Sequence, residues 1–213
     1  MKQVIFFDLD GTLIDTSHRH YMVYKDILDF HKIPNTLLEE EFWSQKKTGR
    51  KTAELLPISE EFSQEFMSDW LRRIEDRTYL KYDTLFLETP DVLSKLRKYN
   101  LVLVTLRNDK QNLFWELDKL KLTEYFSEIL VGSPTSKNKV ELVKKYLKGN
   151  SGRNNCVIVG DSEVDVYTGK KMGFLAIAFT NGIRSRAFLS KAEPDFYIDN
   201  LNEIFKILNE YAV

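Results

Sequence analysis

Two carboxylates separated by one residue stand directly after an apolar run near the N-terminus. The run is Val4 to Phe7, and Asp8, Asp10 and Gly11 follow it. An apolar run bounded by turn signals predicts a buried strand, and the glycine lets the chain turn sharply after it. Two carboxylates this close repel each other. Either a bound cation keeps both ionised, or one of them keeps a proton and acts as an acid.

A second pair of carboxylates follows another apolar run in the C-terminal half of the chain. The run Val157 to Val159 precedes Gly160 and Asp161, and Asp165 comes four residues later. One helical turn separates the two aspartates, so both can face the same site. Ligands of open α/β sheets bind at the carboxyl ends of the strands, which makes both pairs candidates for one site. The alternative is that these aspartates only cap the helices that follow.

The elements that must position these side chains are strands alternating with helices. Further apolar runs predict strands over residues 101–104, 126–131, 175–179 and 194–198. This alternation predicts a three-layer α/β fold with a parallel, Rossmann-like sheet. Helical spacing without any strand pattern predicts helices beginning near residues 17, 39, 52 and 59, the last running to about 82. We therefore expect a core of residues 1–15 and 83–213, with a helical module of residues 16–82 inserted after the first strand.

Composition excludes several classes of partner. The net charge is -1 over 213 residues, so no overall basic field attracts nucleic acid, and no apolar run is long enough to span a membrane. Cys156 is the only cysteine, which excludes an intramolecular disulfide and favours a reducing compartment. We expect a cytoplasmic protein, monomeric or homodimeric, that binds neither nucleic acid nor membrane.

At the first pair of carboxylates the chain resembles the haloacid dehalogenase superfamily of phosphohydrolases. Asp8 to Thr12 matches the first motif of that family, Asp-x-Asp-Gly-Thr after an apolar strand, and Gly160 to Asp165 is similar to the fourth. In length, position and helicity, residues 16–82 resemble the helical cap of one branch, which contains phosphoglycolate phosphatases and β-phosphoglucomutases. The resemblance implies that this cap closes over the active site and selects the substrate.

The second and third motifs each rest on one residue. Thr105 ends an apolar run, and the family's hydroxyl at this place binds a phosphoryl oxygen together with a neighbouring backbone N–H, here that of Leu106. A helix cap is the alternative for Thr105. Lys139 begins a helical pattern and resembles the family's lysine, which offsets the carboxylate charge and contacts the phosphate. Lys137 is the alternative for that lysine.

The resemblance implies a Mg²⁺-dependent phosphatase that hydrolyses a small phosphomonoester through an aspartyl-phosphate. In that scheme Asp8 is the nucleophile, and Asp10 is the general acid and base. The implied Mg²⁺ ligands are the Asp8 carboxylate, the Asp10 backbone carbonyl and Asp161, with Asp165 in an outer position. Thr105, Leu106 and Lys139 would surround the phosphoryl group.

A basic turn is the clearest substrate-binding signal within residues 16–82. Lys46, Lys47, Arg50 and Lys51 surround Gly49. We expect Arg50, with Lys47, to reach the anionic end of the substrate when the cap closes, although a solvated charged face is the alternative. None of the three lysines stands in an apolar stretch that would lower its pKa. Hydrolysis of a phosphonate through a lysine imine is therefore not expected.

Two other functions remain open at this stage. A mutase acting on sugar phosphates would use the same four motifs, and a binding protein that has lost catalysis could keep the fold. Filled motif positions favour an enzyme. Small phosphoesters such as phosphoglycolate, sugar phosphates and nucleotides all remain possible substrates.

Overall fold

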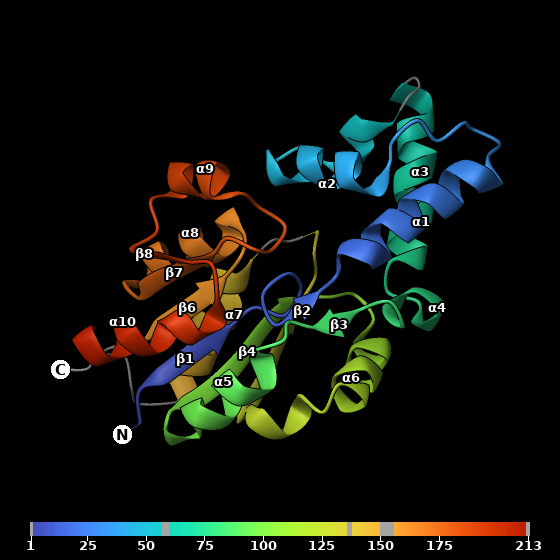
Figure 1. Ribbon diagram of the computed structural model, residues 1–213. Helices are drawn as coiled ribbons and strands as arrows, with labels where there is room; N and C mark the ends of the chain where they lie inside the picture. The colour runs from blue at the N-terminus through green and yellow to red at the C-terminus, as the bar shows by residue number, and fades with distance from the viewer. Residues whose placement is uncertain (1, 57–59, 136–137, 150–155, 212–213) are drawn as a thin grey trace.

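A parallel sheet of six strands forms the centre of the larger part of the molecule (Figure 1). The computed structural model describes residues 2–56, 60–135, 138–149 and 156–211. The strand order is β5-β4-β1-β6-β7-β8, and every neighbouring pair is parallel. The strands are β1 (Val4–Phe7), β4 (Asn100–Leu106), β5 (Glu128–Gly132), β6 (Val157–Gly160), β7 (Leu175–Phe179) and β8 (Phe196–Ile198). The predicted parallel α/β sheet is confirmed.

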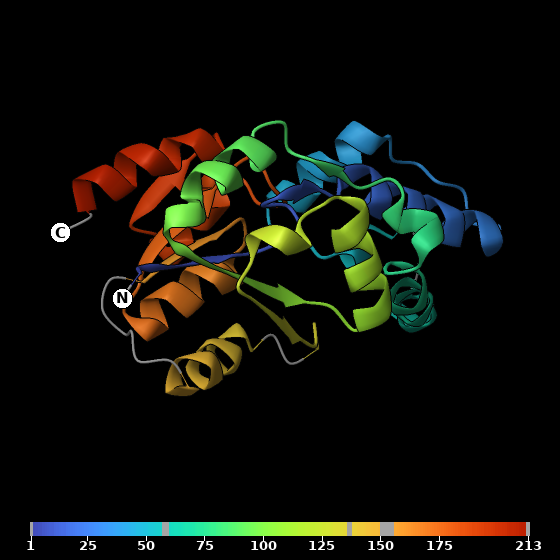
Figure 2. The same cartoon turned by 90° about the horizontal axis from the view of Figure 1, so that it is seen from below.

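Helices cover both faces of this sheet (Figure 2), which is why its central strands are apolar throughout. Side chains at alternate positions of β1 enter opposite layers: Ile5 and Phe7 pack with one set of helices, and Phe6 packs with the other. The first set is α5 (Thr89–Lys95), α6 (Lys110–Lys119) and α10 (Ile204–Tyr211), and the second is α7 (Lys139–Gly149) and α8 (Glu163–Met172). The remaining short elements here are α9 (Arg186–Leu189) and the 3₁₀ turns η2 (Leu96–Lys98), η3 (Thr123–Tyr125), η4 (Ser190–Ala192) and η5 (Leu201–Glu203).

A group of helices, called here the helical insert, lies between two short strands in the sequence. The first strand follows the N-terminal segment of the core, and the second precedes the rest of the core. The strands β2 (Ile14–Asp15) and β3 (Thr84–Leu85) pair antiparallel, so the chain leaves the core and returns to it side by side. The insert comprises α1 (Ser17–Phe30), α2 (Glu39–Lys47), η1 (Thr52–Leu55), α3 (Glu60–Arg73) and α4 (Arg77–Leu80). It has a separate apolar core, which includes Tyr24, Phe42 and Phe66. No helix in the described ranges is both long and apolar enough to cross a bilayer.

The long helix predicted from residue 59 to about 82 is wrong. Two helices, α3 and α4, occupy this stretch, and its expected start at Ser59 lies outside the described residues. The carboxylate of Asp76 accepts the backbone N–H of Thr78 at 2.8 Å and starts a new helix. Just before it, Glu75 accepts the backbone N–H groups of Asn108 and Asp109 at the start of α6. Apolar spacing cannot reveal a break made by such a distant partner.

The insert is docked on the core at a second place, where α2 ends near α9 (Figure 1). The backbone N–H of Ser185 donates to the carbonyl of Lys47 at 3.0 Å. Gly49 lies against the ring of Phe188, and a Cβ at Gly49 would stand 2.0 Å from a ring carbon. The φ of Gly49 is also positive, at 98°. A side chain at this position would meet both backbone strain and a steric clash.

We predict that Gly49→Ala destabilises the protein more than Gly173→Ala does. Gly173 also has a positive φ, 70°, but a Cβ there meets nothing within 4 Å. Gly173→Ala should therefore cost only the backbone strain, about 1–2 kcal/mol, whereas Gly49→Ala adds the clash with Phe188. Denaturant unfolding measures both losses. Equal losses would show that Phe188 moves aside freely and does not fasten the insert to the core.

Candidate active site

Three aspartates meet at the carboxyl ends of two neighbouring strands. Asp8 follows β1 and Asp161 follows β6, and the parallel pairing of these strands brings both residues to the same edge of the sheet. Asp165 joins them from the first turn of α8. One carboxylate oxygen from each residue lies within 4.8 Å of the others, and all three side chains are buried. The structure thus brings together both pairs of the sequence analysis, except for Asp10.

Lys139 is the cation of this cluster. Its Nζ lies 2.6 Å from Oδ1 of Asp8 and 2.7 Å from Oδ1 of Asp165, although it comes from α7. Burial alone would lower the pKa of Lys139, but the carboxylates of Asp165 and Asp8 raise it above its ordinary value. The ammonium group is therefore charged. Lys137, the alternative for this position, lies outside the described residues.

One ammonium does not balance three carboxylates. Burial and the neighbouring Asp165 raise the pKa of Asp8 well above its ordinary value, even though Lys139 opposes this. The same two causes raise the pKa of Asp161 to about 7. Raised pKa values mean that the carboxylates resist ionising together, which a bound cation would reverse. Clustered carboxylate oxygens are ligands suited to a hard cation such as Mg²⁺.

The carboxylate of Asp161 is fixed by both of its oxygens. Thr12 donates its hydroxyl to Oδ1 at 3.2 Å, and the backbone N–H of Ile183 donates to Oδ2 at 2.6 Å. Glycines allow this close approach: a Cβ at Gly11, where φ is 80°, would stand 2.3 Å from Oδ2. A Cβ at Gly182 would stand 2.4 Å from the Cβ of Asp161. The loops after β1 and β7 thus close tightly on this one residue.

Asp165 serves the helix and the cluster at the same time. Its Oδ2 accepts the hydroxyl of Ser162 at 2.5 Å and the backbone N–H of Ser162 at 3.2 Å, an arrangement that caps α8. Its Oδ1 accepts a hydrogen bond from Nζ of Lys139. Capping and site formation, which were alternatives for this aspartate from the sequence, thus occur together in the structure.

Thr105 and Leu106 end β4, the strand on the other side of β1. Thr105 is buried, and within the described part of the chain its hydroxyl has no hydrogen-bond partner. A buried hydroxyl without a partner is costly, so a ligand atom at this edge would be favourable. Leu106 is half-buried and pairs with Gly132 of β5.

Asp10 lies apart from the carboxylate cluster and is bound by two arginines. Arg107 donates from Nε to Oδ2 at 2.7 Å and from Nη2 to Oδ1 at 2.6 Å, and Arg19 donates from Nη2 to Oδ1 at 2.5 Å. Burial would raise the pKa of Asp10, but Arg107 and Arg19 together lower it below its ordinary value. Sequence reasoning missed both arginines. Arg107 stands two residues after Thr105 and could have been noticed, whereas nothing in the sequence marks Arg19.

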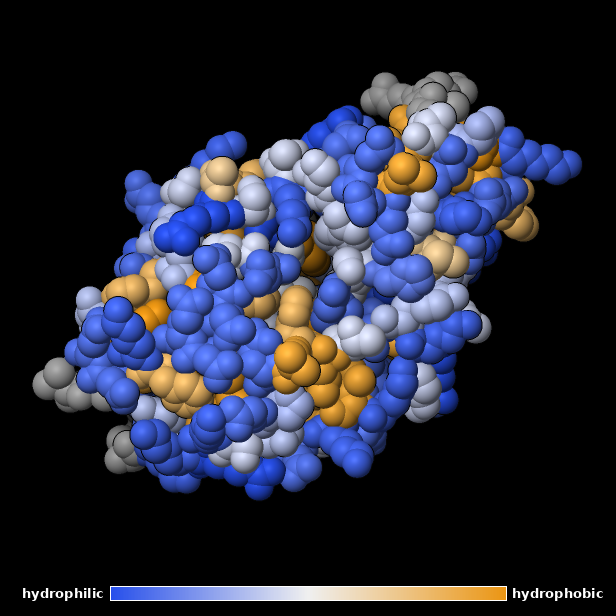
Figure 3. All heavy atoms as spheres, viewed as in Figure 1, coloured by the Kyte–Doolittle hydropathy of each residue, from blue (hydrophilic) through white to orange (hydrophobic). Residues whose placement is uncertain are grey.

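Arg50 lies on the surface of the insert. Its guanidinium donates to the side-chain oxygen of Gln45 and to the carbonyl of Glu54. Lys47 instead lines a cavity of about 520 Å³ that is bounded by α2, by the segment of residues 11–17 that leads into α1, and by the loop of residues 181–183. Figure 3 shows the molecule hollowed in this region, between the insert and the core.

Lys46 corrects one expectation about the basic turn. Its side chain is only 7 % exposed, and its Nζ donates to the hydroxyl of Thr52 at 2.9 Å. No carboxylate of the described residues forms an ion pair with it. Burial and then the nearby Arg184 lower the pKa of Lys46 to about 8. The expectation that no lysine of this turn has a lowered pKa is wrong, because residues distant in sequence bury Lys46.

We predict that Lys46→Met stabilises the protein at neutral pH. A pKa lowered from 10.5 to about 8 corresponds to a charge-burial cost of about 3 kcal/mol, present in full below pH 8. Between about pH 8 and 10.5 the folded protein binds fewer protons than the unfolded chain, so wild-type stability rises with pH. Lys46→Met should gain about 1–3 kcal/mol at pH 7 and lose this advantage near pH 10.5.

Denaturant unfolding across this pH range measures the effect, with the exposed Lys51→Met as the control. A Lys46→Met variant less stable than the wild type at pH 7 would show that the ammonium is favourably paired.

Proteins of similar sequence are named as phosphatases and pyrophosphatases. The chain is 27% identical over 223 residues to a phosphoglycolate phosphatase of Aquifex aeolicus, covering 99% of both chains. It is 25% identical to the pyrophosphatase PpaX of Bacillus mycoides, covering 96% of each. A haloacid dehalogenase-like family hydrolase from Streptococcus pneumoniae has the same fold, with a TM-score of 0.81 at 21% identity over 97% of this chain and 98% of that one. Residues 5–179 match the family model of haloacid dehalogenase-like hydrolases, and the chain belongs to that family.

Proposed function

We propose that this protein is a Mg²⁺-dependent phosphatase that hydrolyses a small phosphomonoester through a phosphate bound covalently to Asp8. The arrangement of Asp8 carries the proposal, because this buried carboxylate contacts Lys139 at the end of β1. Thr105 ends the neighbouring strand β4, and its buried hydroxyl has no hydrogen-bond partner among the described residues. An anionic phosphoryl group would find an ammonium and a hydroxyl at this place. Relatives named phosphoglycolate phosphatase and pyrophosphatase support a phosphorylated substrate.

Each residue of the site has a role in this scheme. An oxygen of Asp8 attacks phosphorus, and the bond from phosphorus to the leaving oxygen breaks. Asp10 supplies the proton that the leaving oxygen needs, and later takes a proton from the water that attacks the phosphate on Asp8. The two steps need opposite protonation states of Asp10. Arg19 and Arg107 favour the carboxylate that takes a proton from water, and they oppose the protonated acid that the leaving oxygen needs. Lys139, the hydroxyl of Thr105 and the N–H of Leu106 bind the phosphoryl oxygens.

The donor atoms present fit a magnesium ion. We propose the Asp8 carboxylate, the Asp161 carboxylate and the backbone carbonyl of Asp10 as its ligands. We propose an outer position for Asp165, in which it would keep its contact with Lys139 and its cap of α8. When bound, Mg²⁺ would neutralise the clustered carboxylates and the oxygens of the phosphoryl group.

We assign substrate selection to residues 16–82, the proposed cap. Arg50 stays a prediction for contact with the anionic end of the substrate. Lys46 is a second candidate, because it is a buried cation that forms no ion pair with the described carboxylates. The cytoplasmic location and the oligomeric state also stay predictions.

Magnesium should raise the thermal stability of the protein. Mg²⁺ at 100 times its dissociation constant would add about 2.7 kcal/mol to the free energy of unfolding. Asp161→Asn should lose most of this response, yet it should be at least as stable as the wild type without metal, because it removes one repelling carboxylate. Thermal scans with and without Mg²⁺ measure both effects. Phosphatase activity that persists in excess chelator would contradict the metal assignment.

Asp8→Asn and Asp10→Asn should fail in different ways. Asp8→Asn should lose both covalent labelling by phosphate and turnover. Asp10→Asn should keep the nucleophile but lose proton transfer, a factor of about 10²–10⁴ with an alkyl phosphate and much less with an aryl phosphate, whose leaving group hardly needs a proton. Labelling with radioactive phosphate and steady-state kinetics separate the two. Labelling that survives in Asp8→Asn and disappears in Asp10→Asn would exchange the roles.

A further inference from the structure

We propose that Arg19 and Arg107 are positioning residues that hold the carboxylate of Asp10 in its working orientation, and that they couple this orientation to the placement of the helical insert. The inference rests on the proposed function, in which Asp10 transfers protons. It concerns two side chains that belong to none of the four sequence motifs.

The grip on Asp10 uses both of its oxygens. The planar fork of Arg107 binds the carboxylate through two parallel hydrogen bonds, and Arg19 adds a third bond to the oxygen already bound by Nη2 of Arg107. Bidentate arginine–carboxylate pairs are strong and directional. Both arginines are buried, so water competes little for these bonds. Rotation of the Asp10 side chain would break all three bonds at once.

Two further buried acids lie beside the arginines. Nη2 of Arg107 lies 3.0 Å from Oε2 of Glu116, and Nη1 of Arg19 lies 3.1 Å from Oδ2 of Asp83. The side chains of Glu116 and Asp83 are fully buried. Glu116 accepts a hydrogen bond from Arg107, whereas Asp83 accepts none from Arg19. Burial raises the pKa of Asp83 to about 9, although Arg19 opposes this. The bond to Glu116 leaves the guanidinium of Arg107 little freedom to follow Asp10 if it rotates. The orientation of Asp10 is therefore set by the network and not by the turn that carries it.

The two arginines reach Asp10 from different parts of the molecule. Arg19 lies in the first turn of α1, just after β2, and Asp83 lies just before β3. These are the two places where the chain crosses between core and insert, and they are paired to each other. Arg107 and Glu116 belong to the core, after β4 and within α6. A rotation of the insert would move Arg19 relative to Arg107 and so change the grip on Asp10.

The direct contacts of the carboxylate cluster come from the core. Lys139, Thr12 and the N–H of Ile183, which contact Asp8, Asp161 and Asp165, all come from outside residues 17–80. The insert also reaches this region, because Arg184 and Ser185, which follow Ile183, donate to the carbonyls of Lys46 and Lys47. Substitution of Arg19 or Arg107 removes bonds to the Asp10 side chain and none of these contacts.

The test compares alkyl with aryl phosphate hydrolysis in Arg19→Met, Arg107→Met and Glu116→Gln. In both arginine variants, the decrease in kcat should be about 10- to 100-fold larger with an alkyl phosphate than with p-nitrophenyl phosphate. This difference between substrates is a smaller form of the one expected for Asp10→Asn. Glu116→Gln, which weakens the support of Arg107 and not a bond to Asp10, should show a several-fold difference in the same direction. The response of thermal stability to Mg²⁺ should stay at the wild-type value in all three.

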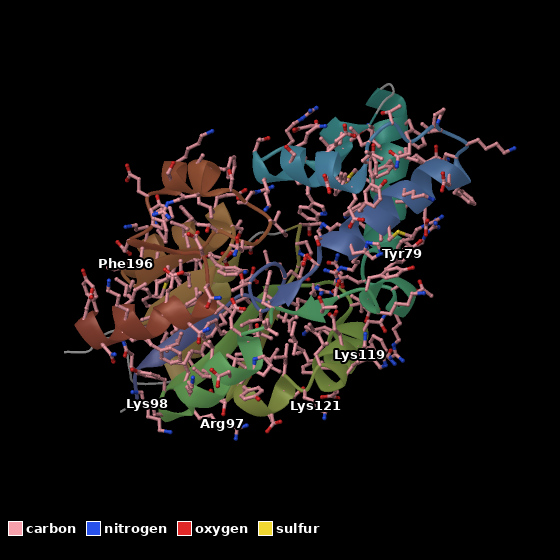
Figure 4. The ribbon with its side chains drawn as sticks, in the orientation of Figure 1. Tyr79, Arg97, Lys98, Lys119, Lys121 and Phe196 are labelled. Atoms are coloured by element: carbon pink, nitrogen blue, oxygen red, sulfur yellow. The ribbon has the colours of Figure 1, made fainter. Side chains whose placement is uncertain are left out.

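Arg97→Met is the matched control, because Arg97 pairs with Glu124 at 2.8 Å on the surface of the core and lies far from the insert (Figure 4). It should lower neither activity. Should a methionine variant fail to fold, Arg19→Lys and Arg107→Lys take its place. Lysine can replace the single bond from Arg19 but not the fork of Arg107, so only Arg107→Lys should keep the full difference between substrates.

Equal losses with both substrates, or a loss of stability alone, would overturn the inference and leave the proposed function intact. A wild-type protein that releases phosphate from neither ester would overturn the proposed function itself, and the inference with it.

Discussion

The contact of one ammonium with two carboxylates holds the candidate site together. Lys139 joins Asp8 at the end of β1 to Asp165 at the start of α8, and no water-exposed charge could do this from the surface. Without that charge, three buried carboxylates would lie close together in the protein interior, where the loss of hydration makes each negative charge unfavourable. The position of α7 beside the sheet is therefore a requirement of the chemistry. The negative charge that Lys139 leaves unbalanced is the reason for which we propose a metal ion as the fifth member of the cluster.

Much of the fold and part of the site could be predicted, because their signals are local. An apolar run followed by Asp8 or Asp161 predicts a strand and identifies the residue at its carboxyl end. Parallel pairing then brings such residues together without further information. The predicted positions of Lys139 and Thr105 followed the same logic of order along the chain, and both lie where strand ends and helix starts converge.

The unpredicted features share a different physical origin. Arg19 and Lys46 look like ordinary surface cations in the sequence, and only tertiary packing buries them. Their surroundings include residues that are remote along the chain: Asp83 lies beside Arg19, and the charge of Arg184 helps to lower the pKa of Lys46. The break between α3 and α4 has the same cause, since Glu75 turns toward α6. Local patterns describe which side chains a segment offers, but not which distant groups will desolvate or bind them.

The place of β1 in the middle of the sheet has a consequence for synthesis of the chain. β1 is made first, yet its partners β4 and β6 begin only at Asn100 and Val157. With about 150 residues between Phe7 and Val157, a ribosome adding 5–20 residues per second needs roughly 8–30 s to deliver the second partner. Throughout this interval four apolar residues with unpaired backbone groups are open to association with other chains. A nascent-chain chaperone that covers the first residues would protect this protein more than one that acts on its C-terminal half.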